Sequence, residues 1–165
     1  MVKHTGLGGS RSDGDRIWPA KSSPAHRGRV LVVEDHEDTR FMLKTFLEMN
    51  GFAVSEAKDG ESALVMAVND TPDLILMDLG LPRFDGLAVT RQIRAHERIG
   101  HLPIIFLSGW TDPQRLRAAM DAGCNDYLVK PVEPDRIVAI IEHWLTPKAR
   151  FVAAWYGAPE AISNQ

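Results

Sequence analysis

Three carboxylates stand where two apolar stretches of the sequence end. Asp78 closes the run 74–78, and Glu34 and Asp35 follow the run 29–33. In a parallel sheet, strands covered on both faces are continuously apolar, and ligands bind beyond their carboxyl ends. Both runs therefore predict strands that direct acids to one edge of a sheet, where three close carboxylates without a cation would repel one another. Such an oxygen-only, acid-rich cluster suits Mg²⁺ better than zinc.

Two further apolar runs end in polar side chains that complement these acids. Ser108 follows the run 102–107, and Lys130 follows the run 127–129. Together with Mg²⁺, a hydroxyl and an ammonium group could stabilise a phosphoryl group on a lone carboxylate. The four strand ends therefore predict phosphoryl chemistry at Asp78. No serine–histidine or cysteine–histidine arrangement typical of hydrolases stands at comparable positions.

The sequence from residue 28 onward supplies the elements that would position these side chains. Short apolar runs alternate with amphipathic stretches of helix length, which is typical of β-α units around a parallel sheet. The expected strands are 29–34, 52–56, 73–78, 103–108 and 126–129. The expected helices are 36–49, 60–69, 85–97, 113–122 and 134–145. Right-handed crossovers would place helices on both faces of the sheet.

Length and charge limit the function classes. A chain of 165 residues suits one domain with short extensions. Its net charge of -3 provides no overall basic field, so direct nucleic-acid binding is not expected. No apolar stretch approaches the roughly 20 residues that cross a bilayer, and no apolar signal core begins the chain, so we expect a cytoplasmic protein without membrane association. The single cysteine, Cys124, is expected to be a packing residue.

The composition divides the chain into three parts. Residues 1–27 are rich in Gly, Ser, Pro and basic side chains and predict a flexible N-terminal extension. Residues 28–146 contain the β-α pattern of the domain. Residues 147–165 form a short C-terminal extension whose aromatic side chains predict a small helix, packed on this domain or on a partner.

At this point the sequence resembles the receiver domains of two-component response regulators, of the chemotaxis-regulator type. The resemblance covers about residues 28 to 146 and rests on the order and spacing of four motifs. These are residues 30–35, residues 73–82 with Asp85-Gly86, residues 107–109 and residues 123–131. It implies a flavodoxin-like (βα)5 fold, a doubly wound parallel sheet of five strands in the order 2-1-3-4-5. The chain is expected to be a stand-alone, single-domain receiver, although a fragment of a longer protein is left open.

The resemblance also implies a role for each matching residue. Asp78 would accept a phosphoryl group from a histidine kinase or a histidine phosphotransfer protein. Asp35, Asp78 and the backbone carbonyl of Gly80 would bind Mg²⁺, with Glu34 acting mostly through water. Lys130 would pair with a phosphoryl oxygen, and the peptide bond between Lys130 and Pro131 would be cis.

The expected switch involves two of these strand ends. Ser108 would hydrogen-bond the phosphoryl group, and Tyr127 would turn from an outward to an inward rotamer, changing the surface for protein–protein signalling. The downstream protein is unknown, and the sequence permits a homodimer without requiring one. Gly80 and Trp110 stand at positions that shape phosphoryl lifetime in this family. Neither offers a carboxylate or an amide to orient water, which predicts slow dephosphorylation.

Two other functions stay open. The chain could be a phosphorylation-independent scaffold on a receiver fold, and failure to bind Mg²⁺ would favour that interpretation. It could also be a Mg²⁺-dependent phosphatase that forms an aspartyl phosphate, although Gly80 stands where such enzymes carry a second Asp. The preferred interpretation is not an enzyme in the ordinary sense, because the protein would catalyse only its own phosphoryl transfer and dephosphorylation.

Overall fold

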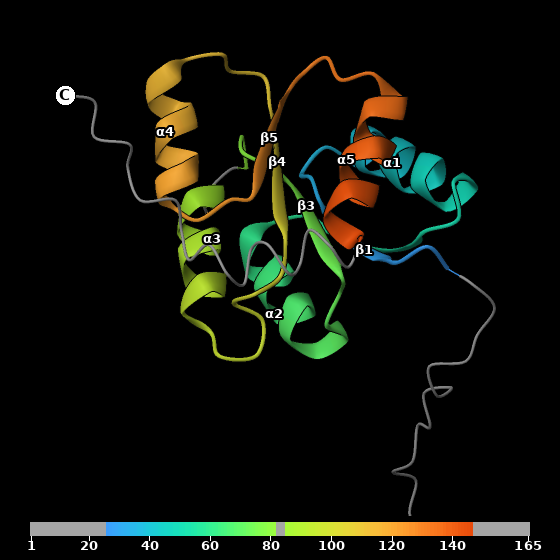
Figure 1. The fold of residues 1–165 in the computed structure, drawn as a ribbon, viewed down its shortest axis with the longest axis horizontal. Helices are drawn as coiled ribbons and strands as arrows, with labels where there is room; N and C mark the ends of the chain where they lie inside the picture. The colour runs from blue at the N-terminus through green and yellow to red at the C-terminus, as the bar shows by residue number, and fades with distance from the viewer. Residues whose placement is uncertain (1–25, 82–84, 147–165) are drawn as a thin grey trace, which may run out of the picture.

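Five parallel strands flanked by five helices make up the computed structural model, which describes residues 26–81 and 85–146 (Figure 1). The strands are β1 (Arg29–Val33), β2 (Ala53–Ala57), β3 (Leu74–Asp78), β4 (Ile104–Ser108) and β5 (Asp126–Val129). The helices are α1 (Glu37–Met49), α2 (Gly60–Asp70), α3 (Gly86–Ala95), α4 (Pro113–Asp121) and α5 (Pro134–Leu145).

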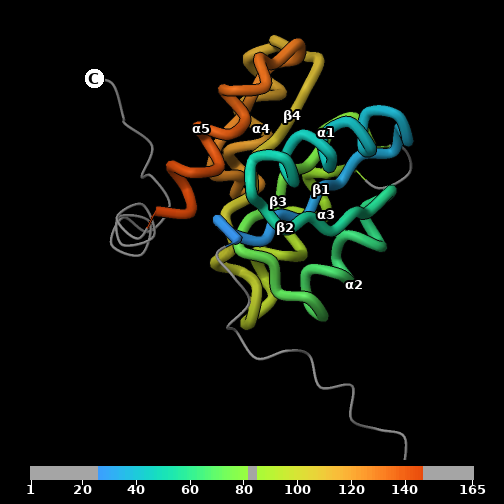
Figure 2. Tube along the Cα trace, turned by 90° about the vertical axis from the view of Figure 1, so that its right-hand side faces the viewer, coloured from blue at the N-terminus to red at the C-terminus, as the bar shows by residue number. Residues whose placement is uncertain are grey.

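The strands form one sheet in the order β2-β1-β3-β4-β5, and every neighbouring pair is parallel. Helices α1 and α5 cover one face, and α2, α3 and α4 cover the other (Figures 1 and 2). This arrangement confirms the expected doubly wound, flavodoxin-like fold. In such sheets the strand order reverses beside the first strand, which places the binding edge at the carboxyl ends of β1 and β3.

The core consists of two apolar layers, one on each side of the sheet. Alternate residues of the central strands point to opposite faces, as the period of a strand requires. Leu31, Ile75 and Phe106 belong to the layer beneath α2, α3 and α4. Val32 and Leu76 belong to the layer beneath α1 and α5. Because the central strands are buried on both faces, their sequences are apolar without interruption until the polar residues at their ends.

Most predicted boundaries lie within one residue of the observed elements, but α3 is shorter than expected. It ends at Ala95, two residues before the predicted end, because His96 adopts an extended conformation. The N–H group of Gly100 donates to the His96 carbonyl at 2.8 Å, which turns the chain toward β4. The sequence predicted a longer helix because its apolar pattern continues through this turn.

Arg94 ties this turn to the loop before β5. Its Nη1 donates to the carbonyls of Gly100 and Leu102 at 2.9 and 2.8 Å, and its Nε donates to the Gly123 carbonyl at 2.8 Å. Its Nη2 donates to Asn125 Oδ1 at 2.7 Å. One guanidinium thus satisfies four oxygens from two connections that have little regular structure of their own.

Aspartates begin the two helices that lie nearest the carboxyl ends of β3 and β4. Asp85 accepts a hydrogen bond from the Leu87 N–H group before α3, and Asp112 accepts one from Gln114 before α4. Pro113 occupies the first turn of α4, where a missing N–H group costs nothing. These caps fix where both loops around the strand ends stop.

The chain enters and leaves the domain at the opposite edge of the sheet. Arg27, which the sequence placed in the N-terminal extension, donates its N–H group to the Gly51 carbonyl at 2.9 Å and forms an ion pair with Glu142 of α5. Gly28 has a φ of 152° and packs so closely on Leu145 that a β-carbon would lie 2.5 Å from its Cδ1 atom. The rest of the predicted N-terminal extension and the predicted C-terminal helix lie outside the described residues.

The described helices are short, and the single cysteine is buried. Within residues 26–81 and 85–146, every helix is too short or too polar to cross a bilayer. Cys124 is buried, as expected, and lies 3.6 Å from the Met120 sulfur. Burial raises the pKa of its thiol to about 11, so Cys124 stays protonated and unreactive near neutral pH.

We expect the substitution Arg94→Met to lower the free energy of unfolding by about 2–4 kcal/mol, because it leaves several oxygens without a donor. Arg91→Met, on the exposed side of the same helix, is the control and should change stability by less than about 0.5 kcal/mol. Urea denaturation followed by circular dichroism would measure both. Equal stabilities of the two variants would contradict the role assigned to Arg94.

Candidate functional site

The register of the sheet brings the polar strand ends together. Asp78, the last residue of β3, lies opposite Leu107 in β4, so Ser108 is one residue further along. Ser108 in turn lies opposite Val129, the residue before Lys130. On the other side of β3, Val33 pairs with Met77, which places Glu34 beside Asp78. The parallel register therefore gathers all four strand ends at one edge.

A single ammonium group joins two of the buried acids. Lys130 Nζ donates to Glu34 Oε2 at 3.0 Å and lies 3.4 Å from Asp78 Oδ2. Glu34 is only 1% exposed and Asp78 is 8% exposed. Carboxylates at this depth require a cationic partner, because burial without one strongly disfavours their charged form. Lys130 supplies that partner from the far side of β3, 96 residues along the chain from Glu34.

Glu34 and Asp35 also share a neighbouring imidazole. His36 Nδ1 lies 3.2 Å from Glu34 Oε1 and 3.1 Å from Asp35 Oδ1. The hydrogen bond to Glu34, with the negative charges of Asp35 and Glu34, raises the pKa of His36 above its usual value. Sequence reasoning had singled out these two acids as metal ligands but assigned no ligand role to His36.

The acids at this edge fit a small divalent cation. Among the described residues, Glu34, Asp35 and His36 place possible ligand atoms within 4.8 Å of one another. Asp35 Oδ1 is buried and accepts no hydrogen bond of acceptable geometry from the described residues, despite the nearby imidazole. A buried carboxylate oxygen without a donor is the kind of atom that a metal ion satisfies. Asp78 is connected to this cluster through Lys130.

Gly80 leaves the Asp78 carboxylate open on one side. The Gly80 N–H group donates to Asp78 Oδ1 at 3.1 Å. A β-carbon at residue 80 would lie 3.5 Å from Asp78 Oδ2, in ordinary contact with it. Gly80 therefore lies directly against the carboxylate but places no side chain there. The side chain of any larger residue at this position would lie beside the Asp78 carboxylate.

Ser108 and Tyr127 are connected through the backbone of Trp110. Ser108 is buried, and its Oγ accepts a hydrogen bond from the Trp110 N–H group at 3.1 Å. The Tyr127 hydroxyl donates to the Trp110 carbonyl at 2.8 Å, while its ring packs partly against the core. The loop after β4 is therefore held at one residue by both side chains of the expected switch.

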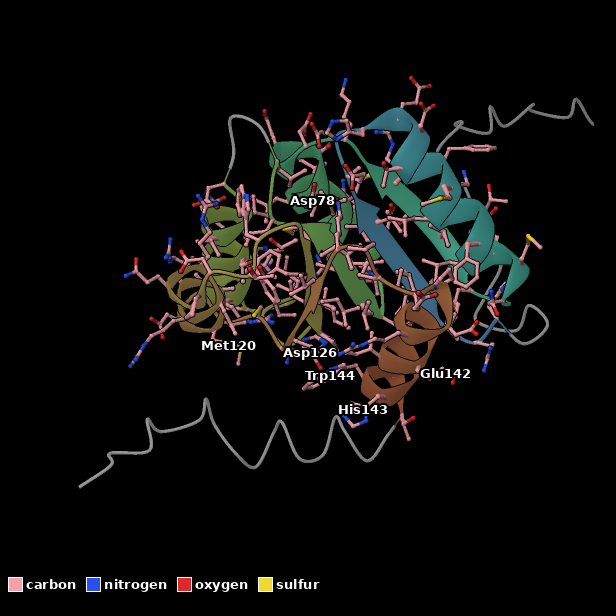
Figure 3. The ribbon with its side chains drawn as sticks, turned by 90° about the horizontal axis from the view of Figure 1, so that it is seen from above. Asp78, Met120, Asp126, Glu142, His143 and Trp144 are labelled. Carbon is pink, nitrogen blue, oxygen red and sulfur yellow. The ribbon has the colours of Figure 1, made fainter. Side chains whose placement is uncertain are left out.

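Both ends of β5 are fixed. The peptide bond between Lys130 and Pro131 is cis, as the resemblance implied. At the start of the strand, Asp126 accepts a hydrogen bond from Trp144 Nε1 of α5 at 3.1 Å, and Figure 3 labels both residues together with Asp78. Helix α5 therefore anchors the strand that carries Lys130.

The sequence did not reveal one cluster beside the site. The Arg115 guanidinium lies over the Trp110 ring, 3.5 Å from its centroid. Both residues line a cavity of about 510 Å³ that also borders Gly80. A cation five positions after an aromatic residue is not a recognisable motif, because the turn between them decides whether the side chains meet.

Comparison with known proteins identifies this arrangement. The family model of the response regulator receiver domain matches residues 30–142. The chain belongs to this family. The receiver domain is a signalling module of two-component systems, and its fold and the order of its motifs agree with the sheet described above.

Curated relatives share the receiver but are longer. The chain is 38% identical over 113 residues to the gliding motility regulatory protein of Myxococcus xanthus, covering 68% of this chain and 14% of that protein. It is 40% identical over 111 residues to the response regulator MprA of Mycobacterium avium, covering 67% of this chain and 48% of that protein. The chain thus spans about half or less of these relatives.

Solved structures of receivers are similar over almost their entire length. A putative response regulator from Chloroflexus aurantiacus is 34% identical with a TM-score of 0.68, covering 72% of this chain and 97% of that structure. The receiver domain of a Pseudomonas aeruginosa sensor histidine kinase is 34% identical with a TM-score of 0.67, over 72% of this chain and 97% of that structure. That structure contains a magnesium ion coordinated in the active-site cleft.

We expect Lys130→Met to lower the free energy of unfolding by about 2–4 kcal/mol at neutral pH, because it leaves buried carboxylates without their cation. The double variant Glu34→Gln with Lys130→Met should recover part of this loss, since it also removes one of the charges. Urea denaturation without Mg²⁺ would measure these two variants and the single variant Glu34→Gln. If the double variant were as unstable as the sum of the single variants, the ion pair would not explain the effect.

Proposed function

We propose that the receiver, residues 28–146, accepts a phosphoryl group on Asp78 from a phosphohistidine of a histidine kinase or phosphotransfer protein. The observation that carries this proposal is the position of Lys130 Nζ, within 3.4 Å of both Glu34 and Asp78. A lone nucleophilic carboxylate beside a cation at the open edge of a parallel sheet suits phosphoryl transfer. Membership of the receiver family supports the same chemistry.

The chain's own residues would divide the reaction between them. A carboxylate oxygen of Asp78 attacks the phosphorus atom, and the bond from phosphorus to the histidine nitrogen breaks. Lys130, which already contacts Asp78, would then shift its contact from the free Asp78 carboxylate to an oxygen of the new phosphoryl group. The Gly80 N–H group, which donates to Asp78, helps to orient the attacking carboxylate.

Glu34, Asp35, Asp78 and the Gly80 carbonyl would hold Mg²⁺. The ion would offset negative charge on the transferred phosphoryl group. The donor-free Asp35 Oδ1 atom and the all-carboxylate character of the side chains support this assignment. Lys130 and His36 now contact these acids. When a metal ion binds, both side chains would have to give up some of these contacts.

The signal would leave the site through the loop after β4. Ser108 Oγ now accepts a hydrogen bond from the Trp110 N–H group, and its O–H group would turn to donate to a phosphoryl oxygen on Asp78, which would move the loop that Ser108 holds. Moving this loop would alter the Trp110 carbonyl that holds Tyr127. The surface of α4 and β5 would change as a result, and its output would be contact with another protein. The protein would catalyse only its own phosphorylation and dephosphorylation.

Phosphorylation by a small donor tests the proposal directly. After incubation with Mg²⁺ and acetyl phosphate, we expect intact-mass measurement to show one phosphoryl adduct on the wild-type chain. Asp78→Asn should show none, and excess EDTA should prevent the adduct on the wild type. Asp73→Asn, directly before β3 at the opposite end from Asp78, is a suitable control and should be phosphorylated normally. An adduct of equal yield on Asp78→Asn would refute the proposal.

The phosphoryl group should be long-lived, because Gly80 and Trp110 provide no side chain that orients water. We expect Gly80→Asn to accelerate dephosphorylation several-fold, since its amide would stand against the Asp78 carboxylate. Gly80→Ala, which adds no polar group, should leave the rate almost unchanged. Phosphate-affinity gel electrophoresis after removal of the donor would give these rates. A wild-type half-life of only seconds would contradict the prediction.

A further inference from the structure

Helix α4 exposes its largest apolar side chains. Of its nine described residues, Ala119 alone is buried. Leu116 and Met120, by contrast, are 42% and 43% exposed. Because these two residues are four positions apart, their side chains lie on the same side of the helix. The helix therefore packs on the sheet through alanine and presents a row of larger apolar side chains to its surroundings.

This exposed row lies on the flank of α4 that faces β5. Ala118, on the other flank, lines the same cavity as Leu87 of α3. Residues two positions apart on an α-helix point in nearly opposite directions, so Leu116 and Met120 both lie away from Ala118. The Met120 sulfur also lies 3.6 Å from the Cys124 sulfur, in the connection between α4 and β5. Both observations place the row toward β5.

Strand β5 continues the apolar surface. It lies at one edge of the sheet, and Val129 near its end is 41% exposed. Alternate residues of a strand share a face, so the Val129 side chain lies on the same face of the sheet as that of Tyr127. Tyr127 packs partly against the core layer beneath α4. Leu116, Met120, Tyr127 and Val129 together form a surface that we call the α4–β5 face.

The chain leaves the domain close to this face. Trp144, in the last turn of α5, donates its indole N–H group to Asp126 at the start of β5. Figure 3 shows Met120, Asp126 and Trp144 along one side of the molecule. Thr146 is extended, and Pro147 follows it, so the chain turns away from the axis of α5 at this point. The residues after α5 therefore begin beside the end of α4.

Residues 147–165 lie outside the described residues, but their sequence contains an apolar segment. Its large side chains recur one turn apart, as on one side of a helix. They are Phe151, Val152, Trp155 and Tyr156. We call residues 151–156 the aromatic segment. A helix this short is only marginally stable without tertiary contacts, so the segment needs an apolar surface to pack on.

The aromatic segment can reach the α4–β5 face. The six residues from Leu145 to Phe151 span at most about 20 Å, which exceeds the about 15 Å that one helix and one strand occupy side by side. The exposed Phe41 and Met42 are less accessible to it. They lie in the first half of α1, toward the pole of the sheet that carries Asp78. The chain leaves α5 at the other pole.

Charges on the two surfaces follow a matching order. Helix α4 ends at the exposed Asp121, and its last turn contains no basic side chain to balance the helix dipole. Arg117, one turn earlier, is also exposed. Within the part of the chain that the structure describes, neither side chain takes part in an ion pair. Lys148 and Arg150 precede the aromatic segment, and Glu160 follows it. A segment that ran back along α4 would bring each charge toward its opposite.

We propose that the aromatic segment docks on the α4–β5 face of its own domain and covers it. The segment would bury Leu116, Met120 and Val129, which the described residues leave exposed. The proposed output of the receiver uses the same surface, so the docked segment would compete with a downstream protein for it. That regulatory consequence rests on the proposed function, whereas the docking itself requires no phosphorylation.

Hydrogen–deuterium exchange of the full chain, measured by mass spectrometry, tests the docking from both sides. Met120→Lys removes an apolar contact and adds a charge that repels Lys148 and Arg150. We expect it to speed exchange of the aromatic segment about tenfold. Trp155→Asp should speed exchange of α4 by a similar factor of about ten, because α4 loses its cover.

Matched variants separate docking from general effects of a new charge. Met49→Lys changes an exposed methionine of α1 and should leave the exchange of both segments unchanged. Ile162→Asp changes an apolar residue beyond the aromatic segment and should also have no effect. Leu116→Lys provides a second change on the α4–β5 face and should reproduce the effect of Met120→Lys. Circular dichroism would verify that every variant is folded.

Reciprocal loss of protection that is independent of protein concentration would support the proposal. Unchanged exchange of α4 in Trp155→Asp, or of the aromatic segment in both lysine variants of α4, would overturn it. Protection that rises over a tenfold range of protein concentration would assign the face to a second copy of the chain, and would also overturn it. No phosphodonor is used, so failure of the docking would leave the phosphorylation of Asp78 untouched, and a chain that takes no phosphoryl group would leave the docking intact.

Discussion

The site depends on the electrostatic balance of buried carboxylates at the edge of the sheet. Glu34 and Asp78 lie where solvent can hardly stabilise their charge, and Asp35 adds a third acid beside them. Lys130 is the cation that the chain itself brings to Glu34 and Asp78, and the His36 imidazole lies against Glu34 and Asp35. Metal binding or phosphorylation at this site, as proposed, would alter the same balance. These charges belong to several strand ends and not to one isolated pair. A change in charge at one strand end therefore affects the contacts of the others.

The parallel sheet makes this balance possible. Residues that lie far apart in sequence become neighbours because β1, β3, β4 and β5 end at a common edge. The apolar layers on both faces fix the register of the strands, since a slip of one residue would exchange the two faces. Packing in the core therefore determines distances at the site, and Asp78 and Lys130 need no loop of their own to hold them. The loop after β4 is different, because polar contacts of its own residues hold it, among them the hydrogen bonds of Ser108 and Tyr127 to the Trp110 backbone.

Most of the fold could be predicted from the sequence because its signals are local and repeated. Continuous apolar runs gave the buried strands, and the polar residue that ended each run marked the site edge, as at Asp78 and Ser108. The end of α3 could not be predicted, because the turn after it depends on contacts of Arg94 with distant carbonyls. The approach of His36 to the acids and the stacking of Arg115 on Trp110 depend on rotamers, about which residue spacing says little. The roles of the individual site residues stay predictions that rest on chemistry and family membership.

The position of Arg27 and Gly28 beside the end of α5 bears on how a receiver can be built into larger proteins. The chain enters the domain next to Gly51 and leaves it next to Leu145, on the pole of the sheet that faces away from Asp78. A segment joined at either end would start from this pole, and two segments would start side by side. Other domains could therefore be joined at both ends of the receiver without covering the edge of the sheet that carries Asp78. That edge would stay free to contact other proteins. In two longer relatives the matching segment covers only 14% and 48% of the chain, so there the receiver is one part of a larger protein.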